Sequence, residues 1–548
     1  MAESSLQRGL ASLSPLLYAV PLTVAAGLVN QIVPEPYLDE IFHIPQAEAY
    51  CEGRWDVWDP KLTTPPGVYL VYVAIHRLIL APVFGMSCLN TAAMRSVNAI
   101  ALLLVARTLQ ALLSRVRKEA DANSDPPTCA ELAQGSSPVK GSGVRTVSPE
   151  TAMRKAIEDP QGSARDARAA IAQAEAVAAD SFSSPFGVLA LDAHIIAFLP
   201  PLWFFGLLFY TDVCSLLSVV ACMLWAKEGR HGSASLAGLA SLLFRQTNII
   251  WVVFILATSI VGTLHTHGLS DAAASDVSPS SIIATLISAV KTLSQAQALT
   301  AVVSLTATYA PVLLAFAGFL VWNGSIVLGD KSNHVAALHF PQLLYFAAFS
   351  VIFGWPAIAA TTPSLPALVR RTVKNLVGGW TQVLLTTVSV GAAVAAVHLF
   401  TIEHPFLLAD NRHYAFYIWR RIVKAHPYAR YALAPVYVVC GRLAWDALAP
   451  TRSFIWMLGF CAALVLTLVP SPLIEPRYFL VPYVVWRAHI VPAGVARRTQ
   501  ADTGQGAVPL WLAAEGAWYL LINVVTVAVF LYRPFKWPSE AGWQRFMW

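Results

Sequence analysis

Two adjacent carboxylates, Asp39 and Glu40, directly follow the first long apolar stretch of the sequence. If the next residues form a helix, polar side chains recur every three or four positions and share one face at the mouth of a membrane. The residues on that face are Asp39, His43, Gln46 and Tyr50. A proline within the segment fits a loop followed by a helix equally well. A lone carboxylate here could simply end a membrane span in water, but its neighbours favour a chemical role.

Aromatic and acidic residues alternate just beyond this face. Trp55 precedes Asp56, and Trp58 precedes Asp59. A tryptophan beside a carboxylate suits a sugar, because the ring can stack on the pyranose while the acid accepts hydrogen bonds from its hydroxyl groups. Tryptophan and tyrosine also form ordinary aromatic belts at membrane surfaces. These residues alone favour neither interpretation over the other.

Cationic residues gather in further clusters at the ends of apolar stretches. The clusters are Lys331 to His339, Asp410-Asn411-Arg412-His413-Tyr414 and Glu475-Pro476-Arg477-Tyr478, and Arg245 interrupts another apolar stretch. A single arginine at such a place usually anchors a helix at the membrane surface. Several clusters on one side of a membrane instead favour phosphate binding. These clusters contain no Asp-x-Asp, and the sequence has no glycine-rich phosphate loop, so we expect neither a nucleotide nor a bound metal.

Membrane helices must position all of these residues. Of the 548 residues, 56% are hydrophobic and only 12% are charged, well below the roughly 25% charge of soluble domains. Uncharged stretches at 10–33, 301–329 and 453–474 exceed the roughly 18 residues that indicate a spanning helix. The pattern predicts an all-α polytopic membrane protein with about twelve membrane helices.

Composition divides the chain into three parts. Residues 1–114 contain a first span, a loop at 34–94 and a second span, and residues 185–548 contain the remaining helices and their loops. Residues 115–184 are rich in Ser, Pro, Gly, Ala and charges, a composition too poor in apolar residues to form a core. Basic residues at the start of this linker place it in the cytosol. The loop 34–94 is then luminal.

The same alternation of sides makes the loops 329–339 and 403–430 luminal. It also requires a helix broken around Arg245, and a broken helix at membrane depth is tolerated where it lines a polar cavity. Within the first loop, the apolar segment 68–84 carries a histidine and an arginine, so we expect a helix lying on the luminal face. Cys51 and Cys88 fall in this loop and could form a disulfide, although nothing in the sequence requires it.

Several motifs carry a resemblance to a known family. They are Asp39-Glu40-Ile41-Phe42-His43, Trp58-Asp59-Pro60, Phe244-Arg245-Gln246-Thr247-Asn248, Leu408-Ala409-Asp410-Asn411-Arg412-His413-Tyr414 and Gln544-Arg545-Phe546-Met547-Trp548. Together they strongly resemble the dolichyl-phosphate-glucose α-1,2-glucosyltransferases of the endoplasmic reticulum. The resemblance extends from the first span to the last residue and fails mainly in the linker.

The resemblance implies the glycosyltransferase C superfold and a defined reaction. Such enzymes transfer glucose from dolichyl-phosphate-glucose to the diglucosylated dolichyl-diphosphate oligosaccharide, Glc2Man9GlcNAc2, and so add the terminal α-1,2-linked glucose used in protein N-glycosylation. Because the donor of this family is β-linked, an α product implies inversion by single displacement. That reaction needs a carboxylate general base and cations that stabilise the leaving phosphate.

The site residues follow from matching these requirements to the sequence. Asp39 is the expected base, and Glu40 is the reserve candidate. The candidates for the donor phosphate are Arg245, Arg412, His413, Arg477 and Lys331. The candidates for sugar or acceptor contacts are His43, Gln46, Tyr50, Trp55, Trp58, Asp59, Asp410, Asn411, Tyr414 and Glu475. No metal or other cofactor is expected, and the role of Asp212 stays open.

The resemblance further implies a multi-pass protein of the endoplasmic reticulum membrane whose site faces the lumen. Its expected partners are dolichyl-phosphate-glucose, the dolichyl-diphosphate oligosaccharide and the bilayer, with no nucleic acid. A non-enzymatic transporter or scramblase of lipid-linked sugars is the alternative. A carrier would explain the spans, but it does not require an acid pair in one loop, and it should show inverted repeats, which we do not find in the sequence.

Overall fold

The computed structural model describes residues 14–124, 188–275, 278–329, 331, 335–493, 509–538 and 542–548. Regular structure within these ranges is helical, and extended backbone pairs only at three isolated bridges. The all-α prediction is therefore confirmed for the described part of the chain. Most of the predicted linker, residues 125–184, lies outside it.

Eight of the described helical segments are long and apolar enough to cross a membrane. They are α2 (Ser14–Ile32), the continuous helix α4–η1–α5 (Gly67–Ile75, His76–Leu80 and Ala81–Phe84), α6 (Thr91–Ser124), η3–α14 (Gln246–Asn248 and Ile249–Thr266), α16 (Ala296–Asn323), α17 (Pro341–Ala359), α19 (Trp380–Phe400) and α26 (Leu510–Tyr532). The protein is accordingly a multi-pass α-helical membrane protein.

The remaining helices are shorter. They are α3 (Glu40–Cys51), α10 (Val188–Ala197), α11 (Pro200–Phe205), α12 (Asp212–Lys227), α13 (His231–Leu242), α15 (Pro279–Leu293), α18 (Leu365–Val377), α20 (Pro405–Ala409), α21 (Tyr414–Ile418), η4 (Trp419–Val423), α22 (Ala429–Ala432), α23 (Ala434–Leu448), α24 (Phe454–Leu468), η5 (Pro476–Phe479) and α25 (Leu480–Ala488).

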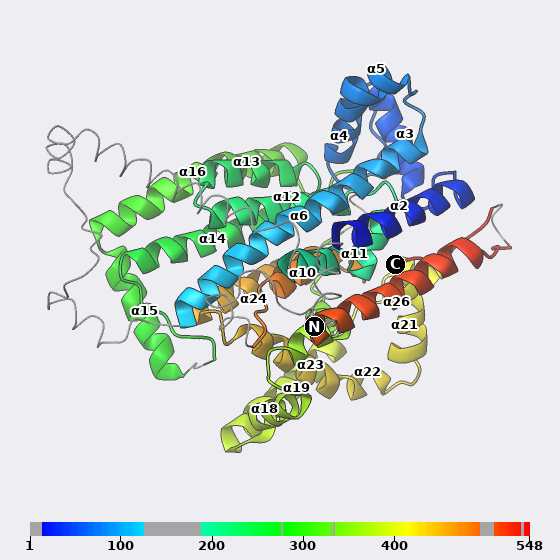
Figure 1. Ribbon diagram of the computed structural model, residues 1–548. Coiled ribbons are helices and arrows are strands. Elements are labelled where there is room, and N and C mark those ends of the chain that lie inside the picture. Colours follow the sequence, from blue (N-terminus) through cyan, green and yellow to red (C-terminus); the bar gives the residue numbers. More distant parts are fainter. Residues whose placement is uncertain are drawn as a thin grey trace, which may run out of the picture.

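Most of the long helices run in roughly the same direction, and α3, α4 and α5 stand together at one end of this bundle (Figure 1). Packing of α12 against α6 and α13, and of α17 against α23 and α26, builds a single large hydrophobic core. α6 continues to Ser124, past the predicted boundary at 115, because ion pairs hold its last turns: Arg117 pairs with Asp192, and Glu119 pairs with Lys227.

The first loop is helical, as expected. α3 packs against α4, and a disulfide joins Cys51 at the end of α3 to Cys88 beyond α5. His76 is buried against this disulfide, where its Nδ1 lies 3.3 Å from Cys51 Sγ and its Nε2 lies 3.0 Å from Met86 O. The polar atoms of His76 are thus bonded within the protein. The segment 67–84 that carries it is also apolar enough to span a membrane.

The predicted break at Arg245 is confirmed. α13 ends at Leu242, Arg245 is extended with φ −148°, and the short η3 leads into α14. α13 begins just after Lys227, whose ammonium group pairs with Glu119 at the far end of α6, whereas Arg245 pairs with Asp212 at the opposite end of α12. The break therefore lies at the same end of the bundle as the first loop.

Candidate active site

Asp39 lies at the junction between the extended chain after α2 and the start of α3. The preceding residue, Leu38, has φ +53°, a left-handed conformation that is uncommon for a residue with a Cβ and that recurs at functional sites. The backbone N–H of Asp39 donates to Tyr210 Oη (3.2 Å), and its carboxylate accepts from Arg477 Nη1 (2.8 Å). Burial raises the pKa of this carboxyl group, but the charge and hydrogen bond of Arg477, together with His43 and His413, outweigh burial and hold the pKa below its usual range. Asp39 is therefore an ionised, partly exposed carboxylate.

Glu40 has entirely different surroundings. Its side chain is fully buried and accepts hydrogen bonds from Arg95 Nε (2.9 Å) and Nη2 (2.6 Å) and from the backbone N–H groups of Tyr37 (3.0 Å) and Phe209 (2.7 Å). A carboxylate has about four lone-pair sites, so this set satisfies it. Glu40 holds together α3, α6 and the segment before α12.

A row of alternating charges continues from Asp39. Arg477 also pairs with Glu475, and Arg245 Nη2 bonds Asp212 Oδ1 (2.6 Å). The ring of Tyr478 lies between the two arginines, 5.7 Å from Arg245 Cζ and 5.9 Å from Arg477 Cζ. Within the described residues, Arg245 Nε is buried without an acceptor. An anion that reached this row would meet the guanidinium groups of Arg245 and Arg477 and could accept a hydrogen bond from the unused Arg245 Nε.

The cluster Asp410 to Tyr414 forms a second polar group. Arg412 forks onto Asp410, with Nη2 to Oδ2 at 2.7 Å and Nε to Oδ1 at 2.9 Å, while Asn411 Oδ1 accepts from Trp537 Nε1 (2.7 Å). Burial raises the pKa of Asp410, but its hydrogen bonds with Arg412 and the charges of His413 and Arg412 together hold the pKa below its usual range. Each of the three arginines at the site therefore faces a carboxylate already.

The last residues of the sequence hold this second group in place. Met547 accepts from the Tyr414 N–H (3.0 Å) and donates to Arg412 O (2.9 Å), and His413 Nδ1 donates to Trp548 O (2.8 Å). Arg545 bonds the Tyr37 hydroxyl through both its N–H (2.7 Å) and its C=O (2.6 Å). We call Gln544–Trp548 the strap, because it ties the first loop to the 410–414 cluster.

The predicted sugar contacts divide into two kinds. Gln46 is structural, since its amide donates to Val57 O and accepts from the Asp59 N–H, both at 2.8 Å. His43 Nδ1 lies 2.6 Å from Tyr69 Oη, and burial lowers the pKa of His43 to about 4, so the ring is neutral at neutral pH. Tyr50 packs on Trp55, with ring centroids 5.0 Å apart, and Trp58 contacts Tyr69. These rings form an aromatic wall beside Asp39.

The side chain of Lys331 bonds the end of α16. It is exposed and donates to Asn323 O (2.6 Å) at the end of α16. Gly329, two residues earlier, has φ +63°, and a Cβ there would lie 2.3 Å from Pro60 O. The loop before Lys331 is therefore pressed against the first loop, which is the contact that sequence reasoning did not find.

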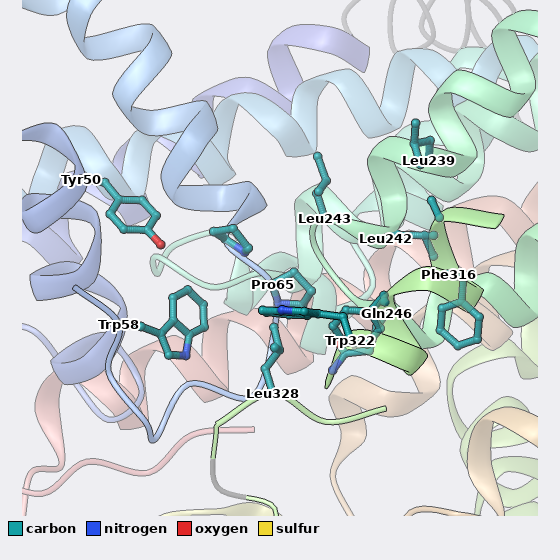
Figure 2. A pocket seen from close by; sticks show the side chains of 13 residues that line it. Tyr50, Trp58, Pro65, Leu239, Leu242, Leu243, Gln246, Phe316, Trp322 and Leu328 are labelled. Carbon is teal, nitrogen blue, oxygen red and sulfur yellow. The ribbon is translucent and has the colours of Figure 1, made fainter. Parts of the chain in front are cut away.

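An apolar cavity of about 470 Å³ opens beside the site. Figure 2 shows Tyr50 and Trp58 on one side, Leu239, Leu242 and Phe316 on the other, and Pro65, Trp322 and Gln246 between them. Its wall depends on Gly67, whose N–H bonds Leu243 O (2.7 Å) and where a Cβ would lie 2.4 Å from that oxygen. Only glycine lets α4 approach α13 this closely.

Sequence reasoning missed several residues of the site. Tyr210 and Tyr69 are aromatic residues in apolar surroundings and carried no signal beyond that. Asp212 stood out as an acid without a role, and the structure places it against Arg245. Among the described residues, metal-ligating side chains converge in one group, Cys51, His76 and Cys88, and the disulfide takes up both sulfurs there.

The fold and the site define a multi-pass α-helical membrane protein with a charged, aromatic-walled site at one end of its helix bundle. A model of the DIE2/ALG10 family matches residues 33–488, which include Asp39, the arginine row and the 410–414 cluster. The chain belongs to the DIE2/ALG10 family.

Curated relatives cover nearly the whole chain. A protein of Arabidopsis thaliana is 31% identical over 97% of this chain and 98% of its own length, one of Mus musculus is 31% identical over 94% and 93%, and one of Homo sapiens is 30% identical over 94% and 93%. All three are named Dol-P-Glc:Glc(2)Man(9)GlcNAc(2)-PP-Dol alpha-1,2-glucosyltransferase. No solved structure matches the chain.

Proposed function

We propose that this protein transfers glucose from dolichyl-phosphate-glucose to the lipid-linked oligosaccharide Glc2Man9GlcNAc2 and forms the terminal α-1,2 linkage. Its similarity to proteins named for this activity, over nearly the full length of both chains, carries the proposal. The site suits the reaction, because a carboxylate, arginines and aromatic rings meet at one mouth of the bundle.

In the proposed mechanism Asp39 is the general base. Its carboxylate removes the proton from the acceptor hydroxyl as that oxygen attacks the glucose carbon, and the dolichyl phosphate leaves from the opposite face. Arg477 and Arg245 stabilise the negative charge that grows on the leaving phosphate. Arg477 Nη1 holds Asp39 Oδ2 at 2.8 Å, and in this mechanism the donor phosphate draws Arg477 away and frees this oxygen as well. Glu475 keeps Arg477 at the site during that exchange.

The 410–414 cluster and the aromatic wall would hold the sugars. His413 lies close enough to Asp39 to lower the pKa of its carboxyl group, and Tyr50, Trp55 and Trp58 supply ring faces for stacking. Asp59, Asn411 and Tyr414 are candidates for hydrogen bonds to hydroxyl groups, and Lys331 is a candidate at the outer edge. Because the site carboxylates pair with arginines, we propose that transfer needs no metal.

We propose the glycosyltransferase C superfold, with about twelve spans. They are the seven long segments other than 67–84, with α13 and α14 counted as one broken helix, and the shorter helices α10, α12, α23, α24 and α25. We also propose that the site faces the lumen of the endoplasmic reticulum. The Cys51–Cys88 disulfide in the first loop supports this orientation, because disulfides persist in that oxidising compartment.

A reconstituted assay tests the function. Purified protein in nanodiscs, given dolichyl-phosphate-glucose and the Glc2Man9GlcNAc2 acceptor in the presence of EDTA, should add one hexose to the acceptor, as read by mass spectrometry. Digestion with a linkage-specific glucosidase should release it as an α-1,2-linked glucose. Movement of either lipid between leaflets without hexose transfer would instead identify a carrier.

A further inference from the structure

We propose that the apolar cavity beside Gln246 binds the first isoprene units of the donor lipid, and that the acceptor lipid binds elsewhere. This inference rests on the glucosyl transfer proposed above. It assigns a lipid site on α13 and α16, at the edge of the arginine row.

The walls of the cavity suit a hydrocarbon chain that enters from the bilayer. Leu239, Leu242 and Phe316 come from two membrane helices, while Pro65 and Trp58 come from the first loop. Trp322 is 77% exposed at the end of α16, so the cavity opens to the side of the bundle. Burying an isoprenoid against such residues is favourable by roughly 25 cal/mol per Å² of apolar surface.

At Gln246 the cavity comes next to the arginine row, because Gln246 follows Arg245 in the chain. Gln246 lines the cavity and directly follows Arg245, whose Nε has no acceptor within the described residues. The Gln246 amide itself donates to Thr63 O (2.9 Å) and Ile326 O (2.7 Å), which fixes the backbone at this point. A phosphodiester bonded to the Arg245 guanidinium would satisfy the unused donor and direct its lipid chain past Gln246 into the cavity.

The chemistry of the two substrates favours the donor as occupant. In dolichyl-phosphate-glucose a single phosphate joins the reacting sugar carbon to the lipid, so the lipid must begin beside the catalytic carboxylate. In the acceptor, the reacting glucose lies at the end of the glycan remote from the diphosphate. The lipid of the acceptor can therefore lie far from Asp39, and the reaction does not require it to bind in a cavity at the arginine row.

Filling the cavity tests the assignment. We would measure KM of the wild-type protein and of the Leu239→Trp variant for two donors. One is dolichyl-phosphate-glucose, and the other is a glucosyl phosphate ester of a single isoprene unit. The larger side chain should raise KM for the long donor by about tenfold, equivalent to about 1.4 kcal/mol, because it takes the space of the chain. KM for the short donor and for the acceptor should stay unchanged, and activity with the short donor reports that the variant is folded.

Leu236→Trp is the matched control, since Leu236 lies three residues earlier on α13, is 69% exposed and does not line the cavity. It should leave all three KM values unchanged. The proposal would be overturned if Leu239→Trp raised KM for the acceptor alone, or if it left KM unchanged for both dolichyl-phosphate-glucose and the acceptor. If Leu239→Trp lowers turnover of both donors alike, a second variant decides. Phe319 on α16 also lines the cavity, and Phe319→Ala should raise KM for the long donor only. Absence of transfer by the wild-type protein with either donor would refute the proposed function instead.

Discussion

At the scale of single residues, Asp39 and Glu40 are neighbours in the sequence with opposite surroundings. Asp39 is partly exposed and bonds Arg477, whereas Glu40 is buried and satisfied by four donors. We therefore assign the chemistry to Asp39 and the support of the fold to Glu40.

Conservative amides separate these two roles. Asp39→Asn should lower kcat by roughly 10²- to 10⁴-fold, the usual contribution of a general base, and leave the thermal midpoint near that of the wild type. Glu40→Gln should destabilise the fold by about 3–5 kcal/mol, because it leaves the Arg95 guanidinium buried without its charge partner. Glucose transfer and thermal unfolding of both purified variants check this. A stable but inactive Glu40→Gln protein would reverse the assignment.

The Arg477–Asp39 pair predicts a difference between two pH profiles. In the free enzyme the pKa of Asp39 lies below its usual range, so the active carboxylate persists to low pH and activity falls only as pH drops through that lowered value. When the donor phosphate draws Arg477 away, the pKa of Asp39 should rise. The acid limb of kcat, which reports the substrate complex, should thus lie at higher pH than the acid limb of kcat/KM for the donor.

Arg477→Lys provides the comparison for these profiles. A lysine keeps one charge but cannot bond Asp39 and Glu475 together as the guanidinium does. The separation between the two limbs should shrink in this variant. Coincident limbs in the wild type would show that Arg477 does not leave Asp39 when the donor binds.

At the scale of elements, the Cys51–Cys88 disulfide closes the helical first loop on itself. The two cysteines are 37 residues apart, and the cross-link joins the end of α3 to the chain after α5. It therefore limits how far this loop can open.

Replacing both cysteines by alanine should lower stability by roughly 2–4 kcal/mol, because the uncross-linked loop gains conformational freedom when unfolded. The thermal midpoint of the purified double variant, with and without reductant, measures the effect. Cys440→Ala, at a free and half-buried cysteine, is the control and should retain the response to reductant. A double variant that unfolds at the wild-type temperature would contradict this role.

The sequence predicted the helices and their breaks better than the ion pairs that join them. The break at Arg245 was predictable because a charge interrupts an apolar run at a place where a span must turn back. The ion pairs of Arg95 with Glu40 and of Asp212 with Arg245 were not, because they join separate helices. Their formation depends on how the helices pack, and neither periodicity nor composition carries that information.

At the scale of the whole molecule, the site is assembled from both ends of the sequence. The first loop supplies Asp39, the middle of the sequence supplies Arg245, a late segment supplies Arg477, and the strap connects Tyr37 to His413. Because Arg545 bonds Tyr37, the strap places the chain after α26 at the same end of the bundle as the first loop. Lys331 shows the limit of prediction by charge, because its ammonium group bonds Asn323 O at the end of α16.

The strap also sets an order of events during synthesis. Tyr37 and Arg545, whose bond joins the two ends of the site, are 508 positions apart. At about 5–20 residues per second, on the order of 25–100 s separates the appearance of the first from that of the second. The first loop therefore emerges from the ribosome long before the strap that bonds it, and a ribosome that stops short of Gln544 releases a chain in which Tyr37 and His413 lack their bonds to the strap.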